Sequence, residues 1–111
     1  MSLPDSMRPE SVVILGKRYA ITYCERPSDV DMYHRESYWG QIDYWTRTIR
    51  IYDFGDRQPE DLWHTLIHEV LHGVVEELKI EQLKGEKNHD ALDILALAIV
   101  DVLFRNDWIK R

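Results

Sequence analysis

Residues 60–78 carry the pattern that most limits the folds open to this chain. Apolar side chains recur there every three or four residues, which is the period of an amphipathic helix. They form two adjacent rows: Leu62, Leu66, Val70, Val74 and Leu78, and beside them Trp63, Ile67, Leu71 and Val75. Pro59 suits the first helical position, and Glu60 and Asp61 place negative charge at the positive end of the helix dipole. We expect a helix of about five turns, whose broad apolar face other elements must cover.

The same helix contains His68-Glu69-Val70-Leu71-His72, an H-E-x-x-H signature. Four residues turn an α-helix by about 400° and advance it by roughly 6 Å, so both imidazoles project from one face. At that separation two histidines can share one zinc ion. Glu69 then lies beside the pair, where it can take a proton from a zinc-activated water. The motif predicts two metal ligands, His68 and His72, and a general base, Glu69.

A catalytic zinc usually has three protein ligands, so a third must come from another element. His64 and Glu76 lie about 6 Å further along the same helix, and we expect them at the rim of the site. His89 begins a second helical pattern and offers an imidazole, and Asp90 is the competing ligand. Asp93, one turn later, is placed to accept the free N–H of a ligand histidine. We favour His89 as the third ligand.

The chain ahead of the motif contains four β-rich runs, at residues 12–15, 19–23, 39–44 and 48–52. Short connections pair them as two hairpins, and residues 25–38 form the longest loop of the prediction. A second helix is expected from Asn88, a suitable N-cap, to Phe104. It is apolar on nearly every side, which predicts burial. The fold class is therefore α+β, with a small antiparallel sheet of about four strands followed by two packed helices.

Composition narrows the functional classes. The 111 residues suit one domain at 11–111, after a flexible leader at 1–10. The net charge of -6 argues against nucleic-acid and membrane partners. The single Cys24 fits a reducing compartment, and no secretion signal is visible, so we expect a cytoplasmic protein. The longest apolar run, residues 94–100, is far shorter than the ~20 residues of a membrane span.

On these residues the chain resembles the small zincin-like metallopeptidases encoded by phages and prophages, related more broadly to ImmA/IrrE-like proteins and gluzincins. The resemblance covers residues 11–107 and is carried by three segments: Gly40-Gln41-Ile42-Asp43, Thr48-Ile49-Arg50-Ile51, and Thr65 through the motif to Gly73. In gluzincins the second helix supplies a glutamate ligand and, four residues later, an aspartate that supports the first histidine. Here His89 and Asp93 occupy those positions, so a histidine replaces the glutamate. A metzincin pattern is excluded, because its glycine and third histidine fall on Val75 and Leu78.

The leading hypothesis is zinc-dependent hydrolysis of a peptide or protein substrate. Residues 48–52 are expected to pair with an extended substrate if they form the sheet edge. Tyr52, Tyr44 and His34 remain open as stabilisers of the oxyanion. Two alternatives are a non-catalytic zinc-binding interaction module of zincin fold and a metal-dependent hydrolase of a non-peptide substrate. The sequence does not indicate an oligomeric state.

Overall fold

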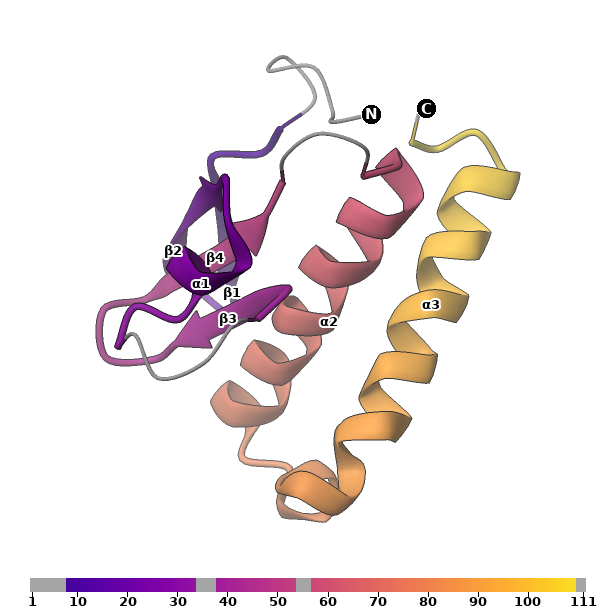
Figure 1. Cartoon of the computed structure of the whole chain (residues 1–111). Helices are drawn as coiled ribbons and strands as arrows, with labels where there is room; N and C mark the ends of the chain where they lie inside the picture. Colours follow the sequence, from indigo (N-terminus) through magenta and orange to yellow (C-terminus); the bar gives the residue numbers. More distant parts are fainter. Residues whose placement is uncertain (1–7, 34–37, 54–56, 110–111) are drawn as a thin grey trace.

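The computed structural model describes residues 8–33, 38–53 and 57–109. Its strands and helices are, in order, β1 (Ser11–Ile14), β2 (Lys17–Cys24), α1 (Pro27–Val30), β3 (Gly40–Asp43), β4 (Thr48–Tyr52), α2 (Pro59–Leu78) and α3 (His89–Arg105). Two short 3₁₀ turns, Glu81–Leu83 and Glu86–Asn88, connect the long helices. Figure 1 shows three layers, with the sheet on one side of α2 and α3 on the other. The predicted α+β class is confirmed.

The prediction of an antiparallel sheet is wrong. The four strands lie in the order β1-β2-β4-β3, and the central pair, β2 and β4, runs parallel from Ala20↔Thr48 to Cys24↔Tyr52. Only the outer pairs, β1 with β2 and β3 with β4, are antiparallel. Parallel neighbours require a crossover between them, and residues 25–47 supply it. β3 belongs to that crossover and pairs at the sheet edge, which leaves β4 enclosed on both sides.

The segment expected to be an irregular loop contains α1, which begins with a proline at its first position. Arg50 on β4 fixes this helix by donating hydrogen bonds to the backbone oxygens of Asp29 (2.6 Å) and Val30 (3.0 Å). Val30 is fully buried as a result. The helical turn thus begins the crossover that returns the chain parallel to β2.

The first hairpin turns at Leu15 and Gly16, one residue earlier than the sequence indicated. Both residues have positive φ, 50° and 86°. Such a two-residue turn matches the right-handed twist of the strands it joins. Lys17 and Arg18, expected in the connection, therefore belong to β2.

The main core lies between the sheet and α2. Its buried members are Ile14, Tyr19, Ile21, Ile49, Ile51, Leu62 and Leu66. Gly73 lets the helix approach this closely, because a Cβ there would lie 2.7 Å from Ile14 Cδ1 and 3.0 Å from Ile42 Cδ1. α2 begins at Pro59, as predicted, and ends at Leu78, where the following residue Lys79 adopts the left-handed conformation. The motif helix is therefore held tightly against the sheet.

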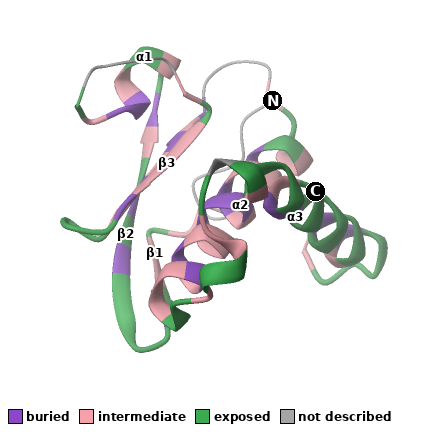
Figure 2. Cartoon of the chain, turned by 90° about the horizontal axis from the view of Figure 1, so that it is seen from below, coloured by how far each residue is buried: buried purple, intermediate pink, exposed green. Residues whose placement is uncertain are grey.

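α3 packs on α2 through one face only, formed by Leu92, Ala96, Val100 and Phe104. The prediction that this helix is buried is wrong, since its outer apolar side chains are exposed. Figure 2 shows much of α3 in the colour of exposed residues. Asn88 precedes α3 as predicted, but its side-chain amide donates to Gln82 O and Lys84 O of the connecting loop. Within the described residues, no helix is long and apolar enough to span a membrane.

Candidate metal centre

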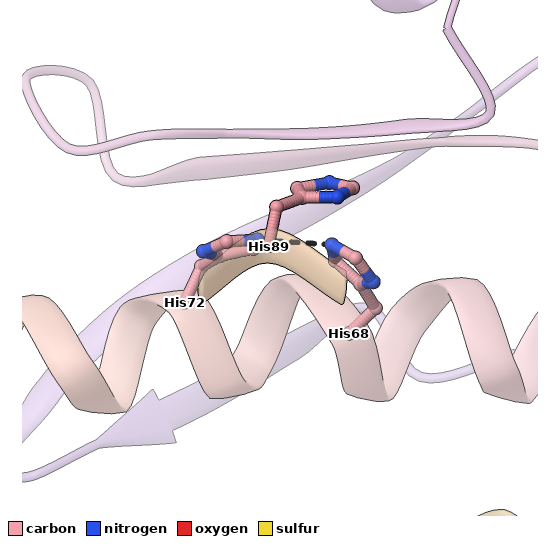
Figure 3. A group of neighbouring side chains, drawn as sticks. All are labelled: His68, His72 and His89. Atoms are coloured by element: carbon pink, nitrogen blue, oxygen red, sulfur yellow. Dashed lines mark hydrogen bonds between the residues drawn. The ribbon is translucent and has the colours of Figure 1, made fainter. Parts of the chain in front are cut away.

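Three histidine side chains converge where α2 meets the start of α3 (Figure 3). One ligand atom from each of His68, His72 and His89 lies within 4.8 Å of the others. The Nε2 atoms of His68 and His72 are 2.9 Å apart, and the ring centroid of His89 lies 4.7 Å from that of His68. A tetrahedral zinc ion separates its nitrogen ligands by about 3.3 Å. Small side-chain adjustments would bring the three nitrogens to that spacing.

His68 is oriented for metal binding by Asp93 of α3. Its Nδ1 lies 2.8 Å from Asp93 Oδ1, so Nδ1–H donates to the carboxylate and Nε2 presents its lone pair to the other two histidines. The sequence predicted this supporting role for Asp93. Burial opposes ionisation of Asp93, but the hydrogen bond from His68 and the charge of His64 hold its pKa below the usual value. The carboxylate is therefore charged at neutral pH.

The two motif histidines are held in the neutral form that a metal requires. Burial lowers the pKa of His68, against the hydrogen bond to Asp93, which raises it. Burial and the neighbouring His68 and His89 lower the pKa of His72 to about 4. A neutral imidazole has a free lone pair on one ring nitrogen. A cation can therefore bind that nitrogen at neutral pH without first displacing a proton from it.

Glu69, the predicted base, is buried on the side of α2 that faces β3. Burial, assisted by the charge of Asp93, raises its pKa to about 8. Gly40, the first residue of β3, makes room for this carboxyl. A Cβ at that position would lie 2.7 Å from Thr65 Cγ2 and 3.1 Å from Glu69 Oε2. A side chain at position 40 would therefore meet Glu69, so this end of β3 lies beside the Glu69 carboxyl.

His64 and Glu76, which the sequence placed at the rim, lie outside the group of three histidines. His64 Nε2 is 3.0 Å from Asp93 Oδ1 and 3.2 Å from the backbone oxygen of the same residue. Glu76 instead pairs with Lys84 at 3.4 Å. His64 therefore braces Asp93, which in turn orients His68.

The side chains of His89 and Asp90 diverge. His89 joins the histidine group, whereas the carboxylate of Asp90 is 99% exposed and approaches only His89 Nδ1, at 3.9 Å. Because α3 begins at His89, its side chain emerges from the first turn toward α2. This geometry favours the histidine over the aspartate as the third ligand.

The structure also bears on the groups considered for substrate binding. Tyr44 donates a 3.3 Å hydrogen bond to the backbone oxygen of His72, which places this tyrosine beside the histidine group. Tyr52 instead packs edge-on against Trp39, at 5.3 Å between ring centroids. His34 lies outside the described residues. The edge strand beside the site is β3 rather than residues 48–52, because β2 and β3 flank β4.

Sequence reasoning missed the part played by Gly40, and it expected His64 at the rim as a supporting group without naming its contact with Asp93. The signal for His64 was present, since it lies four residues before His68 on the same helix face. Gly40 had no such signal, because its role depends on a contact with a residue 29 positions away. In comparisons with family models, curated proteins and solved structures, nothing matches this chain. The geometry of the site therefore carries the functional proposal.

Proposed function

We propose that this chain is a minimal zincin-like metallopeptidase, in which His68, His72 and His89 hold a zinc ion and Glu69 is the general base. The observation that carries the proposal is the convergence of three imidazoles from two helices, with an acid adjacent to one of them in the sequence. Histidine nitrogens suit zinc, and three protein ligands leave a coordination position open, as catalytic sites require. The donor set fits the ion.

Bound zinc supplies a Lewis acid that polarises a carbonyl and acidifies water. The protein's own side chains orient the ligands and transfer the proton. Asp93 and His64 hold His68 in the tautomer that ligates through Nε2. Glu69 accepts a proton from water at the site and passes it to the amine that leaves. Burial raises the pKa of the Glu69 carboxyl to about 8, and a bound cation would favour its ionised form, in which it can act as a base.

The edge strand β3 supports a peptide as substrate. One side of β3 pairs with β4, and no described strand pairs with its other side. An extended peptide can add to such an edge through main-chain hydrogen bonds. Because Gly40 touches Glu69, a peptide bound along β3 would run next to the base. Tyr44, the residue after β3, donates its hydroxyl proton to the backbone oxygen of His72, and a rotation that releases this bond would let it stabilise the oxyanion.

The first test is the metal content of the purified protein and of its His68→Ala, His89→Ala and Asp90→Ala variants. We expect one zinc per chain, lost in the two histidine variants and retained in Asp90→Ala.

The second test is cleavage of a fluorogenic peptide library. Glu69→Gln should keep its zinc and lose activity by about 10²–10⁴-fold. A protein that binds no stoichiometric metal at neutral pH contradicts the proposal.

One observation favours a second candidate, a zinc-binding module without turnover. The described residues form a single lobe, in which one sheet and two helices flank the site, and no second lobe among them faces it. Substrate clefts commonly lie between two such walls. The Glu69→Gln variant separates the candidates, because a binding module keeps both its zinc and its affinity for a partner when this side chain is changed.

A further inference from the structure

The side chain of Trp39 is a large apolar group exposed next to the candidate site. It is 62% exposed and directly precedes Gly40, which lies beside the Glu69 carboxyl. β3, which begins at Gly40, packs against α2, the helix that carries the motif (Figure 1). An exposed indole this close to the proposed base offers an apolar surface that a bound substrate can cover.

Two neighbouring side chains hold the Trp39 ring in place. The Tyr52 ring meets it edge-on, with 5.3 Å between centroids, and the Arg57 guanidinium lies 4.9 Å from its centroid. Arg57 is itself fixed, because it donates hydrogen bonds to Tyr52 O at 2.7 Å and to Thr65 Oγ1 at 2.8 Å. A ring that is already oriented loses little conformational entropy when a ligand covers it. The Trp39 ring is therefore both exposed and oriented before a ligand binds.

Trp39 and Tyr52 are also neighbours across the sheet. In the antiparallel register of β3 and β4, Trp39 lies opposite Tyr52, and the Tyr52 N–H donates a 2.8 Å hydrogen bond to Trp39 O. Alternate residues of an antiparallel strand bond to the same neighbour, so the N–H and C=O of Gly40 point to the outer edge of β3. A peptide that pairs with this edge places one residue beside Trp39, with its side chain on the same face of the sheet. The pair of rings then becomes a row of three side chains.

The next position on this face of β3 is already occupied. Gln41 lies two residues after Trp39, and its side-chain amide donates a 2.9 Å hydrogen bond to Asp31 Oδ1. The amide oxygen of Gln41 also accepts a 3.1 Å hydrogen bond from Met32 N. The Gln41 side chain is therefore bound to the segment that follows α1. Trp39 is thus the position on this face where a bound peptide meets an exposed apolar ring.

We propose that Trp39 sets the substrate preference of the site, by stacking with an aromatic side chain of an extended peptide bound along β3. This preference rests on the proposed function, since both place a peptide along this strand. The peptide residue opposite Gly40 lies nearest to Glu69, and its neighbour lies opposite Trp39. The aromatic residue therefore lies within about two positions of the bond that is cleaved. Two aromatic rings gain from their mutual contact and from the burial of apolar surface.

The first experiment maps the cleavage of a library of fluorescence-quenched hexapeptides, with the products identified by mass spectrometry. We expect phenylalanine, tyrosine and tryptophan to be preferred at one position within about two residues of the scissile bond. Trp39→Ala should reduce the preference in kcat/KM for phenylalanine over alanine at that position by about threefold to tenfold. Trp39→Phe keeps a ring and should retain most of the preference.

Trp108→Ala is the matched control for this experiment. Trp108 is 71% exposed and follows α3, which lies on the opposite side of α2 from the sheet (Figure 1). Its removal should leave the preference unchanged. A flat cleavage profile, a preference for acidic side chains that Arg57 would attract, or equal effects of Trp39→Ala and Trp108→Ala would each overturn the proposal.

The second experiment detects binding without turnover. Nuclear magnetic resonance follows the indole N–H signals of the four tryptophans in the Glu69→Gln variant with added zinc. The probes are a blocked heptapeptide of alanine with one central phenylalanine, and the same peptide with alanine throughout. Trp39→Phe and Trp108→Ala assign the two signals that matter. We expect the Trp39 signal to shift to saturation with the phenylalanine peptide and to shift less with the alanine peptide, while the Trp108 signal stays in place.

The two experiments separate this proposal from the proposed function. A Trp39 signal that shifts with the phenylalanine peptide, in a chain that cleaves no peptide, supports the role of Trp39 and contradicts the peptidase. An unmoved Trp39 signal, or equal shifts with both peptides, overturns the role of Trp39 even if the chain binds zinc and cleaves peptides.

Discussion

Asp93 Oδ1 lies 2.8 Å from His68 Nδ1 and so connects α3 to the motif on α2. The hydrogen bond fixes which ring nitrogen of His68 faces the centre of the site. The same oxygen lies 3.0 Å from His64 Nε2, so this carboxylate holds two imidazoles of one helix face. The orientation of His68 on one helix thus depends on the next helix in the chain.

Replacing Asp93 should weaken metal binding without unfolding the protein. We expect Asp93→Ala to lower the zinc affinity by about 10–100-fold, because the proton on His68 is no longer confined to Nδ1. Competition with a chromogenic chelator measures this loss. Asp90→Ala is the matched control, since it removes an acid of the same helix turn that points to solvent. Equal losses in the two variants would mean that only the net charge of α3 matters.

Glu69 should make the stability of the metal-free protein depend on pH. Its folded pKa of about 8 lies above the ordinary 4.5, so the native state holds the proton more tightly than the unfolded state. The contribution of Glu69 to the free energy of unfolding is therefore greatest below about pH 4.5 and is lost as the pH rises toward 8. Glu69→Gln cannot ionise and should be more stable than the wild type by about 5 kcal/mol above pH 8, the energy of a pKa shift from 4.5 to about 8. Urea unfolding in the presence of a chelator, at about pH 4 and about pH 9, measures the difference. A gap that does not widen with pH would show that the carboxyl is already ionised when folded.

Gly40 should tolerate no side chain while Thr65 keeps its methyl group. Gly40→Ala introduces a Cβ 2.7 Å from Thr65 Cγ2, and we expect a loss of about 1–3 kcal/mol in the free energy of unfolding. Thr65→Ser removes that methyl group but keeps the hydroxyl that accepts a hydrogen bond from Arg57. The double variant should therefore recover part of the stability, because the contacts of the new Cβ with Glu69 Oε2 at 3.1 Å and Glu69 Cγ at 3.2 Å remain. Thermal unfolding of both single variants and the double variant tests this, and strictly additive effects would disprove the contact.

The ion pair between Arg8 and Asp53 should contribute strongly to stability. The Asp53 side chain is fully buried, and its Oδ2 lies 2.7 Å from the Arg8 guanidinium. Arg8→Ala leaves this charge without its partner and should cost about 3 kcal/mol in denaturant unfolding. Arg18→Ala removes an arginine that donates an exposed hydrogen bond to Ser11 Oγ, and should change stability by less than about 0.5 kcal/mol. Restoration of the Arg8→Ala variant by Asp53→Asn would confirm that the isolated charge causes the loss.

The features that the sequence predicted depend on local spacing. Residues three or four positions apart predict the motif helix, and Pro59 marks its start. The contact between Asp93 and His68 follows from the same spacing, once α2 and α3 are known to pack together. The histidine at the start of α3 could be named for the same reason. In each case the spacing of residues along one helix face is enough to predict which side chains lie together.

The errors concern what lies beside an element in space. The strand β2 shows the same alternation whether its neighbour runs parallel or antiparallel, so the pairing with β4 could not be read from either strand. The apolar composition of α3 predicted burial on nearly every side, whereas α2 covers only one face of the helix. Gly40 has no side chain to give a pattern, and its importance appears only against Glu69.

The position of β3 has a consequence for local opening. This strand is four residues long, pairs on one side only and buries just Asp43, whereas β2 and β4 hold each other and the core. Short edge strands of this kind separate from a sheet at a lower free-energy cost than its centre. Backbone amides of β3 should therefore exchange with solvent deuterium before those of β4. The strand that borders Glu69 can thus detach and return while the rest of the molecule stays folded.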